Sequence, residues 1–179
     1  MKQNTNQIFN IMHVMAWLIF IGLCVKTGSL LFSTIVSIFI NPEASQDLYL
    51  GLNVIDLYDT NTWYYVSIMS LIIYILGLQA YIFYLVIKIF SKLNLVQPFS
   101  MEISKLISEI SYIALQIGII SIVINGTGKW LIKREVALYS VGEYLGGSGE
   151  YFLLAGIIFV VAQIFKRGIE IQNENELTI

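Results

Sequence analysis

Residues 64–88 read YYVSIMSLIIYILGLQAYIFYLVIK, and this stretch decides the fold. It carries no charged side chain before Lys88 and consists mainly of aliphatic and aromatic residues. As an α-helix it would be about 37 Å long at 1.5 Å per residue, which is enough to cross a hydrocarbon layer roughly 30 Å thick. The stretch therefore predicts a transmembrane helix.

Three more apolar segments share this character, and the composition agrees with them. The chain is 57% hydrophobic and 12% charged, against roughly 45–50% and about 25% in soluble domains. We therefore predict an all-α integral membrane protein, a four-transmembrane-helix bundle that forms one domain over residues 1–179, with spans at about 10–34, 64–88, 106–127 and 150–167. The first apolar run would be about 50 Å long as one helix, so we expect it to project, tilt strongly or break near Lys26.

The distribution of Lys and Arg predicts the orientation of the spans, because basic residues are enriched in cytoplasmic loops. An arrangement with both termini inside (N-in/C-in) puts Lys2, Lys88, Lys92, Lys105, Lys166 and Arg167 in the cytoplasm, and Lys129, Lys133 and Arg134 outside. The first outer loop agrees with this, since it carries acidic residues and no base. We expect outer loops at 41–62 and 128–149, a cytoplasmic connection at 92–105 and a cytoplasmic tail at 168–179.

The residue inventory gives little support to enzymatic chemistry. A formal charge of −2 argues against the clustered basic surface that binds nucleic acid directly. Cys24 and His13 are single residues of their kind, so an intrachain disulfide and paired haem ligands are excluded. We recognise no nucleophile–base constellation, phosphate loop or set of metal ligands. We therefore expect no enzyme, no catalytic residue, no metal site and no cofactor.

Polar and small residues recur at three- and four-residue steps along the spans, which places them on one face of each helix. Such residues allow close approach and hydrogen bonding between membrane helices, so a packed bundle explains them without a ligand. Lys26 is the most costly, at roughly 2.5–3.5 kcal/mol if it lies at the bilayer centre. It either pairs with an anionic group or lies off-centre and extends to the interface. The intramembrane polar candidates are Lys26, Tyr74, Tyr81, Tyr84 and Gln163.

The connections between the spans carry their own local signals. The outer stretches 48–54 and 132–145 alternate in a strand-like pattern and predict a small extracytoplasmic cap that contains β-structure. Ser100 is expected to cap the helix that leads into the third span. Lys105 and Glu109 have the i,i+4 spacing of an ion pair on that helix.

The chain ends with FKRGIEIQNENELTI at 165–179, directly after the last apolar run. This segment holds an aromatic residue, two bases, a glycine, an apolar–acidic–apolar step and a final Leu-Thr-apolar sequence. Together with QPFS at 97–100, it resembles the signature of the YoaS-like bacterial membrane proteins, domain-of-unknown-function family 2975. Gln97 and Asn173 depart from the usual Asn and acidic residue. The resemblance implies a small multi-pass protein of the bacterial cytoplasmic (inner) membrane with no assigned activity.

The resemblance also implies a partner, because genes of this family commonly stand beside genes for very short helix-turn-helix regulators. A membrane protein that holds or releases such a transcription factor is the first hypothesis. Two alternatives stay open: a small transporter or lipophilic-ligand-binding protein, and a structural subunit of a membrane complex. Homo-oligomerisation also stays open. Candidates for binding a partner, or for docking the tail beneath the bundle, are Arg167, Gly168, Glu170, Gln172, Glu174 and Leu177.

Overall fold

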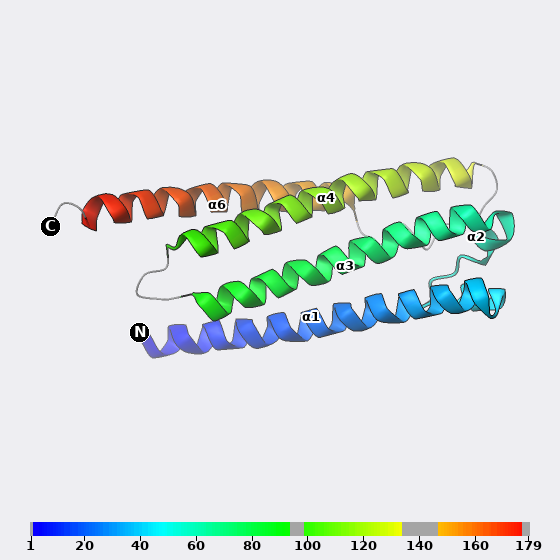
Figure 1. Cartoon of the computed structure of the whole chain (residues 1–179), viewed down its shortest axis with the longest axis horizontal. Helices are drawn as coiled ribbons and strands as arrows, with labels where there is room; N and C mark the ends of the chain where they lie inside the picture. Colours follow the sequence, from blue (N-terminus) through cyan, green and yellow to red (C-terminus); the bar gives the residue numbers. More distant parts are fainter. Residues whose placement is uncertain (1, 94–98, 134–146, 177–179) are drawn as a thin grey trace.

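The computed structural model describes residues 2–93, 99–133 and 147–176, with side chains for 7–93, 99–133 and 147–174. The elements within these ranges are all helical (Figure 1). The long helices are α1 (Lys2–Phe39), α3 (Thr62–Lys92), α4 (Met101–Ile132) and α6 (Ser148–Glu176). Two short elements, η1 (Pro42–Gln46) and α2 (Ile55–Thr60), lie between α1 and α3.

The structure confirms the predicted number of membrane-spanning helices, which is four within the described residues. Each holds an apolar segment long enough to cross a membrane, so the chain is a multi-pass membrane protein. Each helix also extends beyond its predicted span at both ends. α1 does not break near Lys26: the adjacent Thr27 donates its hydroxyl to the Leu23 carbonyl at 2.7 Å within a continuous helix. At 1.5 Å per residue α1 is about 57 Å long, so it must project or tilt.

The four long helices lie side by side in the order α1, α3, α4, α6 (Figure 1). α1 packs on α3, α3 on α4 and α4 on α6. A hydrogen bond of 2.5 Å from the Gln79 side chain to the Tyr151 hydroxyl also joins α3 to α6. One end of the row carries Phe99 and the start of α4, and the other carries Trp63 and the start of α3. We call these the Phe99 end and the Trp63 end.

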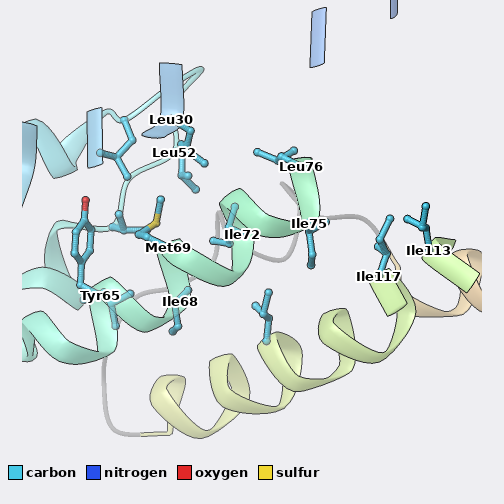
Figure 2. Packing of buried hydrophobic residues seen from close by; sticks show 14 of the residues in the cluster. Leu30, Leu52, Tyr65, Ile68, Met69, Ile72, Ile75, Leu76, Ile113 and Ile117 are labelled. Atoms are coloured by element: carbon cyan, nitrogen blue, oxygen red, sulfur yellow. The ribbon is translucent and has the colours of Figure 1, made fainter. Parts of the chain in front are cut away.

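The hydrophobic core lies between α1, α3 and α4 (Figure 2). Met69, Ile72 and Ile75 recur at three-residue steps on α3 and are fully buried. They meet Leu30 of α1 and Ile117 of α4, which are also fully buried. This spacing keeps one face of α3 toward its neighbours and leaves another face free.

Small residues bring α4 and α6 together on the other side of α4. Ser111 donates its hydroxyl to the Ala155 carbonyl at 2.9 Å, a bond from one helix to the backbone of the next. A Cβ at Gly118 would lie 3.2 Å from Cε2 and Cζ of Phe152, so this ring occupies the space above the glycine. Close approach through small residues is the usual basis of helix association in lipid.

The connection between α1 and α3 differs from the expected β-containing cap. Residues 48–54 form bends and turns between η1 and α2, so the strand expected there is not formed. The side-chain oxygens of Asn41, Asn53 and Asn61 each accept the backbone N–H two residues later, at 2.8–3.1 Å, and these bonds favour helix starts. The buried side chains beneath are Leu48, Leu52, Val54 and Leu57. In the second stretch, 132–145, residues from 134 onward lie outside the described part of the chain.

Candidate functional site

At the Phe99 end, the aromatic ring of Phe99 lies against Gly168 of α6. A Cβ built on Gly168 would lie 2.7 Å from Cδ1 and 2.8 Å from Cε1 of Phe99, closer than real side chains approach. Phe165, one helical turn earlier, meets the same ring edge-on with centroids 5.3 Å apart. A single aromatic side chain therefore fixes the segment before α4 to the end of α6.

The residues predicted to form a polar tail continue α6 as a helix up to Glu176. The expected tail is therefore helical in its described part and continuous with the last span. Ile169 is 9% exposed and Gln172 is half-buried, so one side of this extension continues the inward face of α6. Docking of the tail beneath the bundle stays a prediction, as does binding of a partner by the tail. Leu177 lies outside the described residues.

The opposite side of the α6 extension is exposed and charged. Arg167 and Glu170 form an ion pair with 2.7 Å between Nη1 and Oε2. Glu174 is exposed one turn further along, and the Ile171 side chain is 48% exposed beside it. The candidate residues therefore divide between two faces of one helix, with Arg167, Glu170 and Glu174 on the outward face.

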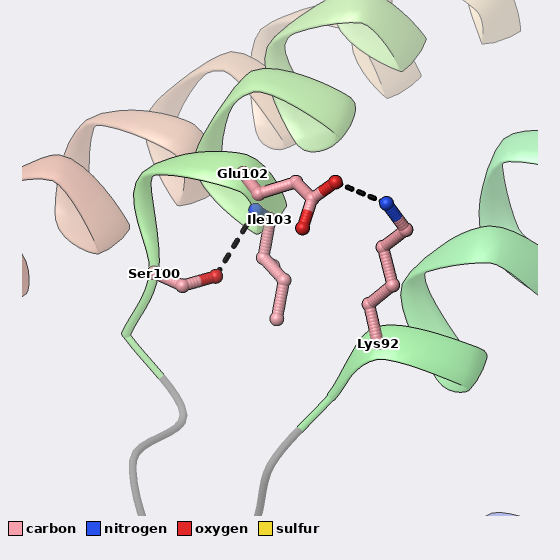
Figure 3. A network of polar contacts seen from close by, with 4 residues as sticks. All are labelled: Lys92, Ser100, Glu102 and Ile103. Atoms are coloured by element: carbon pink, nitrogen blue, oxygen red, sulfur yellow. Dashed lines mark hydrogen bonds and ion pairs between the residues drawn. The ribbon is translucent and has the colours of Figure 1, made fainter.

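The start of α4 is also tied to α3. Ser100 accepts the Ile103 N–H at 3.2 Å, which confirms it as the N-cap residue. Glu102, in the first turn, forms an ion pair with Lys92 at the end of α3 (Figure 3). Exposed pairs of this kind contribute little stability by themselves. The pair and the Phe99 contact together connect the start of α4 to both neighbouring helices.

The predicted tyrosines of α3 share an exposed face. Tyr74, Tyr81 and Tyr84 are 51%, 41% and 41% exposed, and Gly77 between them is exposed as well. The rings of Tyr81 and Tyr84 stack with centroids 6.0 Å apart. Tyr84 also contacts the Phe20 ring of α1, so within the described residues Tyr74 is the tyrosine of this stripe that has no side-chain partner.

Glu109 of α4 joins this face through Tyr81, whose hydroxyl donates to Oε1 at 2.8 Å. The expected ion pair of Glu109 with Lys105 is not formed, because the carboxylate turns toward α3. A carboxylate in the apolar segment of a membrane helix is costly to place and is usually paired. Tyr81 is the partner that satisfies it here.

The two remaining intramembrane candidates lie on the edge helices. Lys26 is half-buried on α1, between the Phe20–Tyr84 ring contact at 6.2 Å and the Ser37–Tyr65 hydrogen bond at 2.5 Å. Gln163 is exposed on α6, at the other edge of the row. The five candidates therefore do not form one site.

Two exposed polar residues of α4 are not among the candidates predicted from the sequence. Tyr112 is 57% exposed, and Gln116 is exposed one turn beyond it. Both follow Glu109 at steps of three and four residues, so the helical period could have placed them on one face with it. The contact of Phe99 with Gly168 was also missed, and no local pattern predicts a pairing of residues so far apart in the chain.

No group of three or more His, Cys, Asp and Glu side chains that could hold a metal occurs in the described ranges. His13 accepts a hydrogen bond from Trp17 Nε1 at 3.2 Å and stacks on Phe90. An apolar hollow of about 550 Å³ lies on α6, away from Lys26, and is lined by Phe152, Leu153, Gly156, Ile157, Val160 and Val161.

Comparison with known proteins gives a family and no activity. The model of the family described as Protein of unknown function (DUF2975) matches residues 53–179. This range holds α3, α4 and α6, and with them the contact between Phe99 and Gly168. No curated protein and no solved structure matches the chain. Because the family model covers well over half of its length, the chain belongs to the DUF2975 family.

Proposed function

We propose that this chain is a non-enzymatic protein of the bacterial cytoplasmic membrane that binds and regulates a small helix-turn-helix transcription factor. The observation that carries the proposal is the end of α6. It continues as a helix beyond the apolar segment, is held at Gly168 by Phe99, and exposes Glu170 and Glu174 on its outward face.

The charge distribution supports a cytoplasmic position for the Phe99 end. Lys92, Lys105, Lys166 and Arg167 lie at or near this end of the row. At the Trp63 end the connection between α1 and α3 is acidic, and the bases there are the fewer Lys129, Lys133 and Arg134 around the end of α4. Basic residues next to membrane spans are retained in the cytoplasm. The proposed orientation is therefore N-in/C-in, with the α6 extension facing the compartment that holds the transcription factor.

The outward face of the α6 extension has the chemistry that a small DNA-binding module would meet. Such modules carry Lys and Arg for the phosphate backbone. Glu170 and Glu174 provide acidic partners, and Ile171 provides an apolar contact between them. A regulator bound through its basic surface is kept from DNA, so binding at the membrane and repression by the free regulator exclude each other.

The test is capture of the small helix-turn-helix regulator encoded beside the gene, using the full chain in lipid nanodiscs. Glu170→Lys with Glu174→Lys should weaken capture at least tenfold, because charge reversal opposes a basic partner. The matched control is Glu43→Lys with Asp59→Lys, which reverses two exposed acidic residues at the Trp63 end. Equal capture by both double variants and the unaltered chain would refute the proposal, as would a complete lack of capture.

A further inference from the structure

Two adjacent helices carry mostly exposed polar side chains that the Tyr81–Glu109 hydrogen bond joins across α3 and α4. This surface consists of Tyr74, Gly77, Tyr81 and Tyr84 of α3 and of Glu109, Tyr112 and Gln116 of α4, and we call it the tyrosine face. We infer that the tyrosine face binds a second copy of this chain within the membrane. This inference is independent of the proposed regulator, which would bind at the Phe99 end.

Contacts between α3 and α4 fix the depth of each residue on the tyrosine face. The Tyr81–Glu109 hydrogen bond of 2.8 Å and the Tyr64–Trp130 ring contact of 5.9 Å set an antiparallel register. Tyr74 lies seven residues from Tyr81 on α3, and Gln116 lies seven residues from Glu109 on α4. Both are therefore about 10 Å, or two helical turns, nearer the Trp63 end than the Tyr81–Glu109 bond. These residues therefore share one depth, close to the middle of α3 and of the apolar layer.

The hydrogen-bonding groups at this depth lack partners in one copy of the chain. Within the described residues, neither the Tyr74 hydroxyl nor the Gln116 amide makes a hydrogen bond, and both side chains are exposed. Acyl chains offer no hydrogen bonds, and an unpaired polar group in hydrocarbon is costly. A phenol at mid-depth is also too short to reach the interface. Whatever molecule packs on the tyrosine face must therefore supply hydrogen-bonding groups of its own.

A second copy meets this requirement by symmetry. Most homo-oligomers use a two-fold axis, and their interfaces pair residue i with j and j with i. An axis along the membrane normal keeps depth unchanged, so Tyr74 of each copy comes opposite Gln116 of the other. Gly77 lies about one helical turn from Tyr74, and a Cβ there would meet nothing within 4 Å, which leaves room for the approaching helix. The surface belongs to two neighbouring helices and suits a helical partner.

The test uses single cysteines in a chain whose exposed native thiol is removed by Cys24→Ser. Gly77→Cys places a thiol within the tyrosine face, and Ser70→Cys places one on exposed α3 surface one turn before Tyr74. Gly156→Cys is the matched control on α6. Both glycines have open space for a Cβ, and the Ser111–Ala155 bond puts Gly156 at a similar depth. Oxidation in native membranes should cross-link the α3 variants at least tenfold more than Gly156→Cys.

A second arm tests the polar contact itself. Tyr74→Phe with Gln116→Leu removes the hydroxyl and the amide and should lower cross-linking at Gly77→Cys at least fivefold. Circular dichroism and gel filtration of each variant confirm that the chain is folded. Cross-linking at Gly156→Cys that equals the α3 variants, or no effect of the double substitution, overturns the inference. A folded monomer that carries a lipophilic molecule in native mass spectrometry also overturns it, because the occupant is then a ligand.

Discussion

Phe99 and Gly168, far apart in the chain, are in contact at the end of the helix row. The position of a Cβ on Gly168 would be 2.7 Å from the Phe99 ring, so the ring occupies the space of the absent side chain. This contact decides that the last turns of α6 are held by the segment before α4. It gives the outward face of α6 a fixed position relative to the start of α4, which a disordered tail would lack.

Substitution of Gly168 should therefore be costly. We expect Gly168→Ala to lower the free energy of unfolding by about 1–3 kcal/mol, because the added methyl displaces the Phe99 ring. Unfolding of the purified chain in mixed micelles, followed by circular dichroism, measures this. Gly156→Ala, where a Cβ meets nothing within 4 Å, should be neutral or stabilising by up to about 1 kcal/mol. Phe99→Ala should remove most of the Gly168→Ala penalty, and simple additivity of the two would contradict the contact.

The contact of Gly118 with Phe152 should govern the packing of α4 on α6. Gly118→Val adds a branched side chain where a Cβ already lies 3.2 Å from the ring. We expect a loss of about 1–3 kcal/mol in unfolding free energy. Gly126→Val on the same helix is the control, since a Cβ there meets nothing within 4 Å. Equal losses for the two variants would show that helix propensity, and not the Phe152 contact, sets the cost.

Tyr65 should stabilise the Trp63 end through its hydroxyl. Its side chain is fully buried, and Ser37 already donates its own proton to the Thr34 carbonyl at 2.8 Å. Tyr65 is therefore the donor in the 2.5 Å bond to Ser37. Tyr65→Phe should lower the unfolding free energy by about 1 kcal/mol. Tyr64→Phe, which keeps the ring contact with Trp130, should change it by much less, and the reverse order would contradict this assignment.

The proposed orientation predicts which thiols a membrane-impermeant maleimide reaches in intact cells. In a Cys24→Ser chain, Glu43→Cys in η1 should be labelled at once, because the Trp63 end faces outward. Asn173→Cys in the α6 extension should be labelled only after permeabilisation. Both positions are exposed, so a reversed pattern would show that the Phe99 end is extracytoplasmic.

Much of this architecture follows from local sequence. The length and apolar content of 64–88 predict α3, and the same reasoning predicts the other three spans. Ser100 predicts the start of α4 because N-capping involves neighbouring residues alone. The strand predicted over 48–54 is not formed. Alternating apolar residues also occur in an irregular segment that lies between two short helices and buries some of its side chains. There, the Asn53 side chain accepts the N–H of Ile55, the first residue of α2, and this local bond favours a helix start over a strand.

The sequence by itself determined the number, length and apolar character of the spans, because these depend on residues next to one another in the chain. Only the tertiary structure decided which residues from different helices meet. It paired Glu109 with Tyr81 instead of Lys105, continued the tail as the end of α6, and placed Phe99 on Gly168. The physical reason is that lipid exerts no hydrophobic force between helices. Their register is therefore set by close packing and by a few hydrogen bonds between distant residues.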